Sequence, residues 1–342
     1  MANIAIKAVA AGAKLFEETR FFMANDMANS QIRNVAIVGT GLIGASWAAQ
    51  YLASGFDVIA TDPAPDAEPN LRKWVDEAWE LLTVKGLASG ASRDRLTFTA
   101  DMKEAVSKAD FVQESVPERL LLKTKVFAQM DESAPPDAIL ASSASGITMD
   151  AIQTGCKQHP ERCVIGHPFN PPHVIPLVEV VGGAKTSEAV IERAMAFYAL
   201  IGKKPIRLRK ALPGHVGNRL QAALYREVLY LIQQGVVSVE DADIAVCYGP
   251  GLRWGVMGPS LQWHLGGGPG GIQHFVKTFM DGFVGQMKKL EMPDVTPALM
   301  QTVIDGVLKE ANGQSVEQLA QAENKLVLEL LALRVKAGGT LP

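Results

Sequence analysis

The stretch from Asn34 to Gly44 reads N-V-A-I-V-G-T-G-L-I-G, and it decides the fold of this chain. The apolar run before the first glycine predicts a buried strand, and the residues at 45–53 predict a helix. Between them, Gly39 permits a tight turn, Gly41 lets a ligand approach the backbone, and Gly44 allows close packing of helix on strand. A strand, this Gly-x-Gly-x-x-Gly turn and a helix in that order indicate a dinucleotide-binding unit.

An acidic residue follows the glycine turn. Asp62 ends a second expected strand at 57–60, near the spacing of about 20 residues that such sites show. Its carboxylate would accept hydrogen bonds from an adenosine ribose and would repel the extra phosphate of NADP. We therefore expect NAD as the cofactor; the alternative is a solvated carboxylate at a strand end. The expected NAD-binding residues of this unit are Gly39, Gly41, Leu42, Ile43, Gly44 and Asp62.

The chain continues as short β-rich runs that alternate with helical stretches, which predicts a parallel sheet with crossover helices. The expected strands cover 35–38, 57–60, 111–113, 139–141, 163–165, 177–181 and 205–208. The expected helices cover 45–53, 71–85, 121–130 and 187–201.

After Pro213 and Gly214 the pattern becomes helical, with a Gly- and Pro-rich loop region at 248–271 and a capped helix at 315–335. The predicted fold class is therefore α/β: a Rossmann-type parallel-sheet domain followed by an all-helical C-terminal domain. The expected divisions are an N-terminal extension at 1–33, an NAD-binding domain at 34–213 and a helical domain at 214–342.

The composition restricts the partners. A net charge of −3 gives no electrostatic reason to expect nucleic acid or an anionic membrane surface. No apolar run reaches the length that spans a bilayer. Three cysteines without a C-x-x-C pair suit a reducing compartment. We expect a cytoplasmic protein with small-molecule ligands and without nucleic acid, membrane or metal.

A histidine and a glutamate form the candidate catalytic pair. His167 follows an expected strand, at the edge of the sheet where ligands bind. Glu179 lies inside an apolar run, where a carboxylate needs a partner. Together they would remove a hydroxyl proton while hydride leaves the carbon, with Glu179 orienting the imidazole. The alternative is a hydrogen-bonded core histidine and a glutamate that pairs with an arginine.

Two further polar residues lie near expected strand or helix ends. Ser145 follows another expected strand, and Asn218 opens the first helix of the second half. A substrate contact and an ordinary turn or helix residue are both open for each of them.

These segments resemble the 3-hydroxyacyl-CoA dehydrogenase family from about Asn34 to about Val256. The ordered matches are V-G-T-G-L-I-G at 38–44, E-S-V-P-E at 114–118, the serine-rich 142–146, G-H-P-F-N-P at 166–171, L-V-E-V-V at 177–181, and P-G at 213–214 before N-R at 218–219. The resemblance implies an enzyme that oxidises an L-3-hydroxy group with NAD, with His167 as general base and Glu179 as its orienting carboxylate.

The resemblance also implies further roles. Ser145 and Asn218 would bind the substrate oxygens, and Glu118 and Lys123 match family positions that contact NAD. The helical half would carry substrate contacts and form a homodimer.

One segment departs from the acyl-CoA members. The sequence G-L-R-W at 251–254 resembles the branch that acts on free hydroxy acids, namely L-carnitine dehydrogenases and gulonate dehydrogenase/λ-crystallin relatives. Arg253 offers a planar fork for a free carboxylate, and Trp254 suits a quaternary ammonium group. We therefore expect a hydroxy acid substrate, with carnitine first and Arg253 and Trp254 as contacts. The alternative for Arg253 is a structural ion pair.

Two other functions stay open. A short-chain 3-hydroxyacyl-CoA dehydrogenase is the alternative enzyme, since a basic run at 203–210 would suit the phosphates of CoA. Its cations are Lys203, Lys204, Arg207, Arg209 and Lys210, and they would otherwise form a solvated strand edge. A protein without turnover, as among crystallins derived from this family, is the alternative of another class. The intact set of Ser145, His167, Glu179 and Asn218 argues against it.

Overall fold

The computed structural model describes residues 32–337, which form two compact units that divide between Gly217 and Asn218. Residues 1–31 of the expected N-terminal extension lie outside the described residues. We expected the domain boundary after residue 213, and that boundary remains a prediction. Between residues 32 and 337, no helix is long and apolar enough to cross a membrane.

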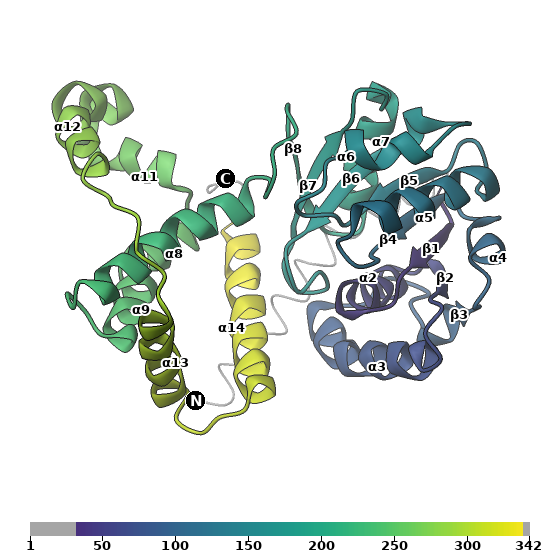
Figure 1. Ribbon diagram of the computed structural model, residues 1–342, viewed down its shortest axis with the longest axis horizontal. Helices are drawn as coiled ribbons and strands as arrows, with labels where there is room; N and C mark the ends of the chain where they lie inside the picture. Colours follow the sequence, from purple (N-terminus) through teal and green to yellow (C-terminus); the bar gives the residue numbers. More distant parts are fainter. Residues whose placement is uncertain (1–31, 338–342) are drawn as a thin grey trace. The chain divides into compact units, whose positions relative to one another are not determined.

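The first unit is built on one eight-stranded sheet with the order β3-β2-β1-β4-β5-β6-β7-β8 (Figure 1). Its strands are β1 (Asn34–Val38), β2 (Asp57–Thr61), β3 (Leu96–Phe98), β4 (Phe111–Glu114), β5 (Ile139–Ser142), β6 (Cys163–Pro168), β7 (Leu177–Gly182) and β8 (Lys204–Arg207). The first six run parallel, in the order of a doubly wound nucleotide-binding sheet. The predicted Rossmann-type fold is confirmed, and β3 is a strand that we did not predict.

The last two strands depart from the parallel arrangement of the rest of the sheet. β7 pairs antiparallel with β6, and β8 pairs parallel with β7. Only the segment 169–176 joins β6 to β7. Such a short connection suits a hairpin, whereas a parallel crossover needs about a dozen residues or more.

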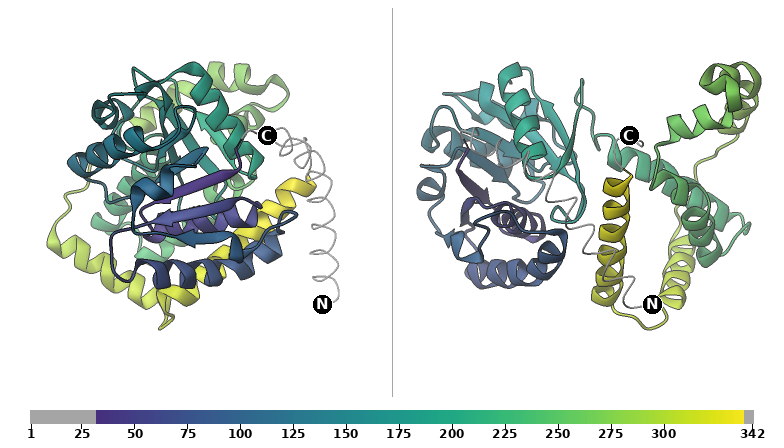
Figure 2. Two further views of the ribbon diagram at one scale, coloured as in Figure 1. Left: turned by 90° about the vertical axis from the view of Figure 1, so that its right-hand side faces the viewer. Right: turned by 180° about the vertical axis from the view of Figure 1, so that it is seen from behind.

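Helices cover both faces of the sheet (Figure 2). They are α2 (Leu42–Ala53), α3 (Ala67–Lys85), α4 (Met102–Val106), α5 (Leu120–Ser133), α6 (Met149–Ile152) and α7 (Glu188–Leu200), with 3-10 turns at 93–95, 153–155 and 160–162. Alternate residues of β1 enter opposite cores. Val35 and Ile37 lie in the core of α2, α3 and α7, whereas Ala36 and Val38 lie in the core of α4, α5 and α6. Burial on both faces explains why this strand is apolar throughout.

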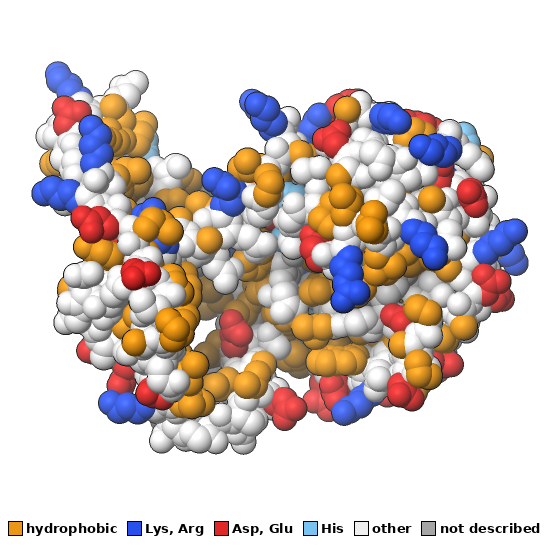
Figure 3. Space-filling view, in the orientation of Figure 1, with side chains coloured by type: hydrophobic (Ala, Val, Ile, Leu, Met, Phe, Trp, Pro, Cys, Tyr) orange, Lys and Arg blue, Asp and Glu red, His pale blue; other side chains and the backbone are white. Residues whose placement is uncertain are grey.

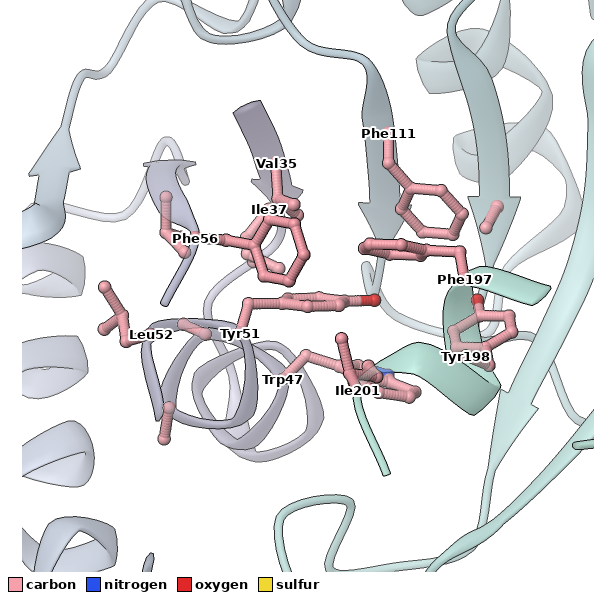
Figure 4. Packing of buried hydrophobic residues seen from close by; sticks show 14 of the residues in the cluster. Val35, Ile37, Trp47, Tyr51, Leu52, Phe56, Phe111, Phe197, Tyr198 and Ile201 are labelled. Carbon is pink, nitrogen blue, oxygen red and sulfur yellow. The ribbon is translucent and has the colours of Figure 1, made fainter. Parts of the chain in front are cut away.

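The core on the α2 side is rich in aromatic rings (Figure 4). Trp47 and Tyr51 stack within α2 with ring centroids 5.3 Å apart, and Phe111 of β4 contacts Phe197 of α7 at 4.5 Å. Rings of this size bury large apolar areas in fixed geometries. They hold α2, and with it the glycine turn that precedes α2, firmly on the sheet.

The second unit is helical, as predicted. Its helices are α8 (Gly217–Gln233), α9 (Val239–Tyr248), α10 (Pro250–Trp254), α11 (Pro259–Gly266), α12 (Gly271–Met287), α13 (Pro297–Ala311) and α14 (Val316–Lys336), with a 3-10 turn at 268–270. A small core joins α8, α9 and α13 through Val228, Ile232, Val239, Ala242 and Leu299. Many large apolar side chains of this unit stay exposed, as the hydrophobic atoms on its surface in Figure 3 show.

The prediction of a loop region at 248–271 is wrong, because this segment contains α10, α11 and the start of α12. Pro250 and Pro259 take the first positions of α10 and α11, directly after glycine N-caps. Proline suits that position because its missing amide would have no intrahelical partner there. The expected C-terminal helix is confirmed, with a capping box between Ser315 and Gln318.

Candidate active site

The glycine turn after β1 fits a bound dinucleotide. A Cβ at Gly39 would lie 2.9 Å from the Ser115 carbonyl carbon, and one at Gly44 would lie 1.9 Å from the Gly39 carbonyl oxygen. At Gly41, however, a Cβ would meet no heavy atom of residues 32–337 within 4 Å, so packing among these residues does not require this glycine. Gly41 is also the N-cap of α2, without any side-chain cap. A pyrophosphate on the first amides of α2 would account for both observations.

Asp62 is fixed beside this turn at the carboxyl end of β2. Its Oδ2 accepts a hydrogen bond from the Thr40 amide at 2.9 Å, and its Oδ1 accepts one from the Ala64 amide at 3.0 Å. Two backbone donors thus hold the carboxylate at the place where an adenosine ribose would donate to it.

A pocket of about 1120 Å³ opens along the carboxyl ends of the strands. It exceeds the roughly 300–1,000 Å³ of most small-ligand sites, which suits an extended dinucleotide. Its wall includes Gly39, Gly41, Leu42, Ile43, Asp62, Glu118, Lys123 and Ser145. Of the residues expected to bind NAD, only Gly44 is not part of this wall, because it is buried against Gly39.

Glu118 and Lys123 make contacts within the protein that the sequence did not indicate. Glu118 Oε1 accepts hydrogen bonds from three successive amides that begin at Ser145, at 3.0, 2.7 and 3.1 Å. Lys123 is buried and donates to Glu114 Oε1 at 2.8 Å. Glu118 therefore shapes the loop that carries Ser145, and Lys123 neutralises a buried carboxylate.

His167 and Glu179 meet in the hairpin of β6 and β7. His167 Nδ1 lies 2.8 Å from Glu179 Oε2. The other oxygen, Oε1, accepts hydrogen bonds from the amides of Val216 and Gly217 at 2.7 and 2.9 Å. An ionised carboxylate only accepts, so His167 carries its proton on Nδ1 and keeps a lone pair on Nε2. That lone pair can take a proton from a hydroxyl group.

The surroundings keep this pair in the protonation states of a base and its partner. Burial would raise the pKa of Glu179, but hydrogen bonds from Gly217, His167 and Val216 outweigh it and lower that pKa. Burial lowers the pKa of His167 below its usual value, although the hydrogen bond to Glu179 raises it. At neutral pH, Glu179 is therefore ionised and His167 is neutral.

His215 connects the pair to the loop of Ser145. Its ring centroid lies 4.9 Å from that of His167, and its Nε2 donates to the Ala144 carbonyl at 3.0 Å. The first unit thus gathers Ser145, His167 and Glu179 at one corner. No sequence pattern indicated a chemical role for His215.

The three remaining candidates belong to the helical unit. Asn218 is the second residue of α8 and is half-buried, whereas Arg253 and Trp254 are exposed at the end of α10. None of the ion pairs among residues 32–337 involves Arg253, which removes support from the structural alternative for this residue.

The loop between β6 and β7 is tied to α2 and to two lysines, which sequence patterns did not indicate. Ser46 Oγ accepts a hydrogen bond from the His173 amide at 3.0 Å and donates to His173 Nδ1 at 2.7 Å. Lys85 donates to the His173 carbonyl at 2.9 Å, and Lys203 donates to two further carbonyls of the loop. Burial, together with the charges of Lys85 and Lys203, lowers the pKa of His173 to about 4. The His173 ring is therefore neutral at neutral pH, and its Nδ1 can accept the hydrogen bond from Ser46.

The basic run at 203–210 is not a wholly free cationic surface. Lys203 is buried in the contacts of that loop, and Arg207 pairs with Glu188. Two of the five cations thus serve contacts within the protein, which weakens the argument for CoA phosphates.

A glycine turn that fits a dinucleotide, in one sheet with a buried His–Glu pair, defines an NAD-dependent dehydrogenase. Residues 34–211 match the NAD-binding domain of 3-hydroxyacyl-CoA dehydrogenases, and residues 214–317 match their C-terminal domain. The chain belongs to the 3-hydroxyacyl-CoA dehydrogenase family, which confirms the resemblance found in the sequence.

L-Carnitine dehydrogenases are among its relatives. The one from Streptomyces griseus is 45% identical over 315 residues, which cover 92% of either chain. The one from Bacillus cereus is 43% identical over 312 residues, which cover 91% of this chain and 95% of the relative. The likeness therefore extends through both units.

Solved structures show the same fold. A 5-formyl-3-hydroxy-2-methylpyridine 4-carboxylic acid 5-dehydrogenase, an NAD+ dependent dismutase, superposes with a TM-score of 0.72 at 30% identity, covering 90% of this chain and 99% of that one. An (S)-3-hydroxybutyryl-CoA dehydrogenase from Ralstonia eutropha reaches a TM-score of 0.58 at 27% identity, over 64% of this chain and 79% of that one.

Proposed function

We propose that this protein oxidises the 3-hydroxyl group of L-carnitine to a ketone, with NAD as the hydride acceptor. The observation that carries the chemistry is the buried His167–Glu179 pair, whose geometry leaves Nε2 of a neutral imidazole free. The L-carnitine dehydrogenases that are 43–45% identical to the chain support the choice of substrate.

The residues of the first unit divide the chemistry among them. Gly39, Gly41 and Asp62 would hold NAD. The bound NAD would accept the hydride that leaves C3 of the substrate. The hydroxyl proton passes to His167 Nε2 as that C–H bond breaks. Glu179 is held ionised by two amides and stabilises the imidazolium that results. Ser145 would donate a hydrogen bond to the substrate oxygen, from a loop that Glu118 holds.

Residues of the helical unit would select the substrate. Arg253 presents an exposed guanidinium that pairs with no carboxylate in the described part of the chain, which suits a free acid as its partner. Trp254 would face the quaternary ammonium group of carnitine by cation–π attraction, and Asn218 would bind the substrate oxygens. The solved relative that is named for a pyridine carboxylic acid is likewise named for a free acid.

The first experiment is NADH formation at alkaline pH with L-carnitine, L-gulonate, 3-hydroxybutyrate and 3-hydroxybutyryl-CoA side by side. Saturable turnover of carnitine without turnover of the thioester is the expected result. Turnover of the thioester alone would contradict the proposal and would return the protein to the acyl-CoA branch.

We also propose a homodimer, formed by the helical unit, in the cytoplasm, where the NAD that it needs is available. Large apolar side chains are exposed on α12, α13 and α14, among them Phe279, Leu308, Leu326 and Leu333. Exposed apolar patches of this kind mark association surfaces. Sedimentation of the purified protein at micromolar concentration tests this, and a monomer would contradict it.

A further inference from the structure

Two serines of the NAD pocket form a hydrogen-bonded pair to which the proposed chemistry gives no task. Ser115 follows β4 and Ser143 follows β5, and both belong to the pocket wall. Their Oγ atoms lie 2.9 Å apart. Ser115 also packs against Gly39, and Ser143 stands two residues before Ser145. The pair therefore lies between the glycine turn and the catalytic loop.

Gln113, which is fully buried in β4, donates a hydrogen bond to this pair. Its Nε2 lies 2.9 Å from Ser143 Oγ and 3.4 Å from the Gly166 carbonyl oxygen. A reversed amide would set its own oxygen against that carbonyl oxygen, so the nitrogen must point this way.

The other end of the Gln113 amide agrees with this orientation. Its Oε1 accepts hydrogen bonds from the hydroxyls of Tyr51 and Tyr198 at 3.2 and 2.7 Å, and both tyrosines belong to the core in Figure 4. Burial raises the pKa of both tyrosines, which keeps them as donors. Gln113 is therefore a donor to Ser143 whatever the serines do.

A count of the hydroxyl protons shows that one of the two serines keeps a proton that the pair itself does not use. The two serines have two protons and share one hydrogen bond. If Ser115 donates to Ser143, the proton of Ser143 is left; if Ser143 donates, the proton of Ser115 is left. In either case, one O–H on the pocket wall has no acceptor among the described residues. A half-buried donor without an acceptor is costly, so a ligand atom that accepts there is favoured.

We infer that the Ser115–Ser143 pair donates one hydrogen bond to the nicotinamide riboside half of NAD, to a ribose or carboxamide oxygen. Asp62 is the residue expected to bind the adenosine ribose, whereas the serine pair adjoins the loop of Ser145, where the substrate hydroxyl would react. The inference depends on NAD as the cofactor and not on carnitine as the substrate.

Because either serine can supply the spare proton, the pair predicts a non-additive double-mutant cycle in NADH binding, read by fluorescence titration. Ser115→Ala leaves Ser143 with its proton, and Ser143→Ala leaves Ser115 with its own. Each single change should raise the Kd for NADH less than about 3-fold. The double change removes both hydroxyls and should raise it about 10-fold.

Two controls separate this contact from general damage. Ser107→Ala removes an exposed hydroxyl that donates to the Glu104 carbonyl outside the pocket, and it should leave the Kd unchanged. ADP, which lacks the nicotinamide riboside, should bind the double variant as it binds the unaltered protein. Additive effects, an unchanged Kd for NADH in the double variant, or equal losses for ADP and NADH would each overturn the inference.

Discussion

His167 and Glu179 stand directly opposite each other in the antiparallel ladder of β6 and β7, and their side chains meet at 2.8 Å. Cross-strand partners share one face of a sheet, so the register of the hairpin sets this pair. A slip of one residue would turn Glu179 to the other face. The pairing of base and carboxylate is thus built into the backbone of the hairpin.

Glu179→Gln should lower kcat for carnitine oxidation by roughly 10²- to 10⁴-fold, because a neutral amide cannot stabilise the imidazolium of His167. The Kd for NADH should change little. Steady-state kinetics and NADH titration measure the two effects. Glu188→Gln is the matched control, since Glu188 pairs with Arg207 on the surface. A loss of kcat below 10-fold would show that Glu179 is not the orienting carboxylate.

The pH dependence of oxidation should follow His167. Oxidation needs the neutral imidazole, so kcat/KM is full above the pKa of His167 and falls as pH drops through it. Burial lowers this pKa below 6.5, so the fall should begin below that pH. Because Glu179 raises the pKa of His167, Glu179→Gln should move the fall to lower pH. A profile from about pH 8 to about pH 5 that falls above 6.5 would argue against His167 as the base.

Gly41 and Gly44 should respond in opposite ways to alanine. The added Cβ of Gly41→Ala lies within 4 Å of no atom in the described part of the chain, so the free energy of unfolding should stay near its original value while the Kd for NADH rises at least about 10-fold. Gly44→Ala sets a Cβ against the Gly39 carbonyl and should cost about 2 kcal/mol of stability or more. Urea unfolding and NADH titration separate the two. Equal losses of stability would contradict the role of Gly41 in pyrophosphate binding.

Arg253→Ala should raise the KM for carnitine about 10- to 100-fold, since it removes charged hydrogen bonds to the carboxylate. The KM for NAD should stay the same. Arg72→Ala serves as the matched control, because Arg72 forms an exposed pair with Glu68. Unchanged kinetics for Arg253→Ala would remove this residue from the substrate site.

His173 should make the fold sensitive to acid. Its pKa in the folded state is about 4, below the usual 6.5, so the unfolded chain binds the extra proton between these values. Stability is then full above about pH 6.5 and is lost as pH falls toward 4, by roughly 1–3 kcal/mol after allowance for solvent screening. His173→Asn keeps an acceptor for Ser46 without this titration. Its unfolding free energy should fall less between about pH 7 and pH 4.5, and an equal fall would contradict the assignment.

Local patterns sufficed to predict most of the fold. The glycine turn, the apolar strands and the capping box at Ser315 all depend on neighbouring residues, and the structure has each of them. The direction of β7 was missed because it depends on the length of a connection rather than on any residue pattern. The helices at 250–266 were missed because glycine and proline serve as caps and first positions as well as in loops.

The contacts of the candidate site could likewise be predicted from the sequence only in part. His167 and Glu179 could be predicted as a pair because a buried acid needs a partner and twelve residues separate them. The contact of Ser46 with His173 spans 127 positions, and that of Gln113 with Tyr198 spans 85. A serine within an apolar helix has no pattern that indicates such a partner, so only the folded arrangement reveals these contacts.

The contact between Ser46 and His173 makes α2 a spacer of fixed length. Gly41 caps the end of α2 that would face the phosphates. Ser46 lies five residues further on, about 7.5 Å along the helix axis, and is hydrogen-bonded to the hairpin that bears His167. The distance between the bound phosphates and the proton acceptor His167 is therefore set by one helix of the first unit. If α10 determines the substrate preference, substitutions in α10 can change the preferred hydroxy acid. The alignment of hydride and proton transfer then stays the same, because it depends on the first unit.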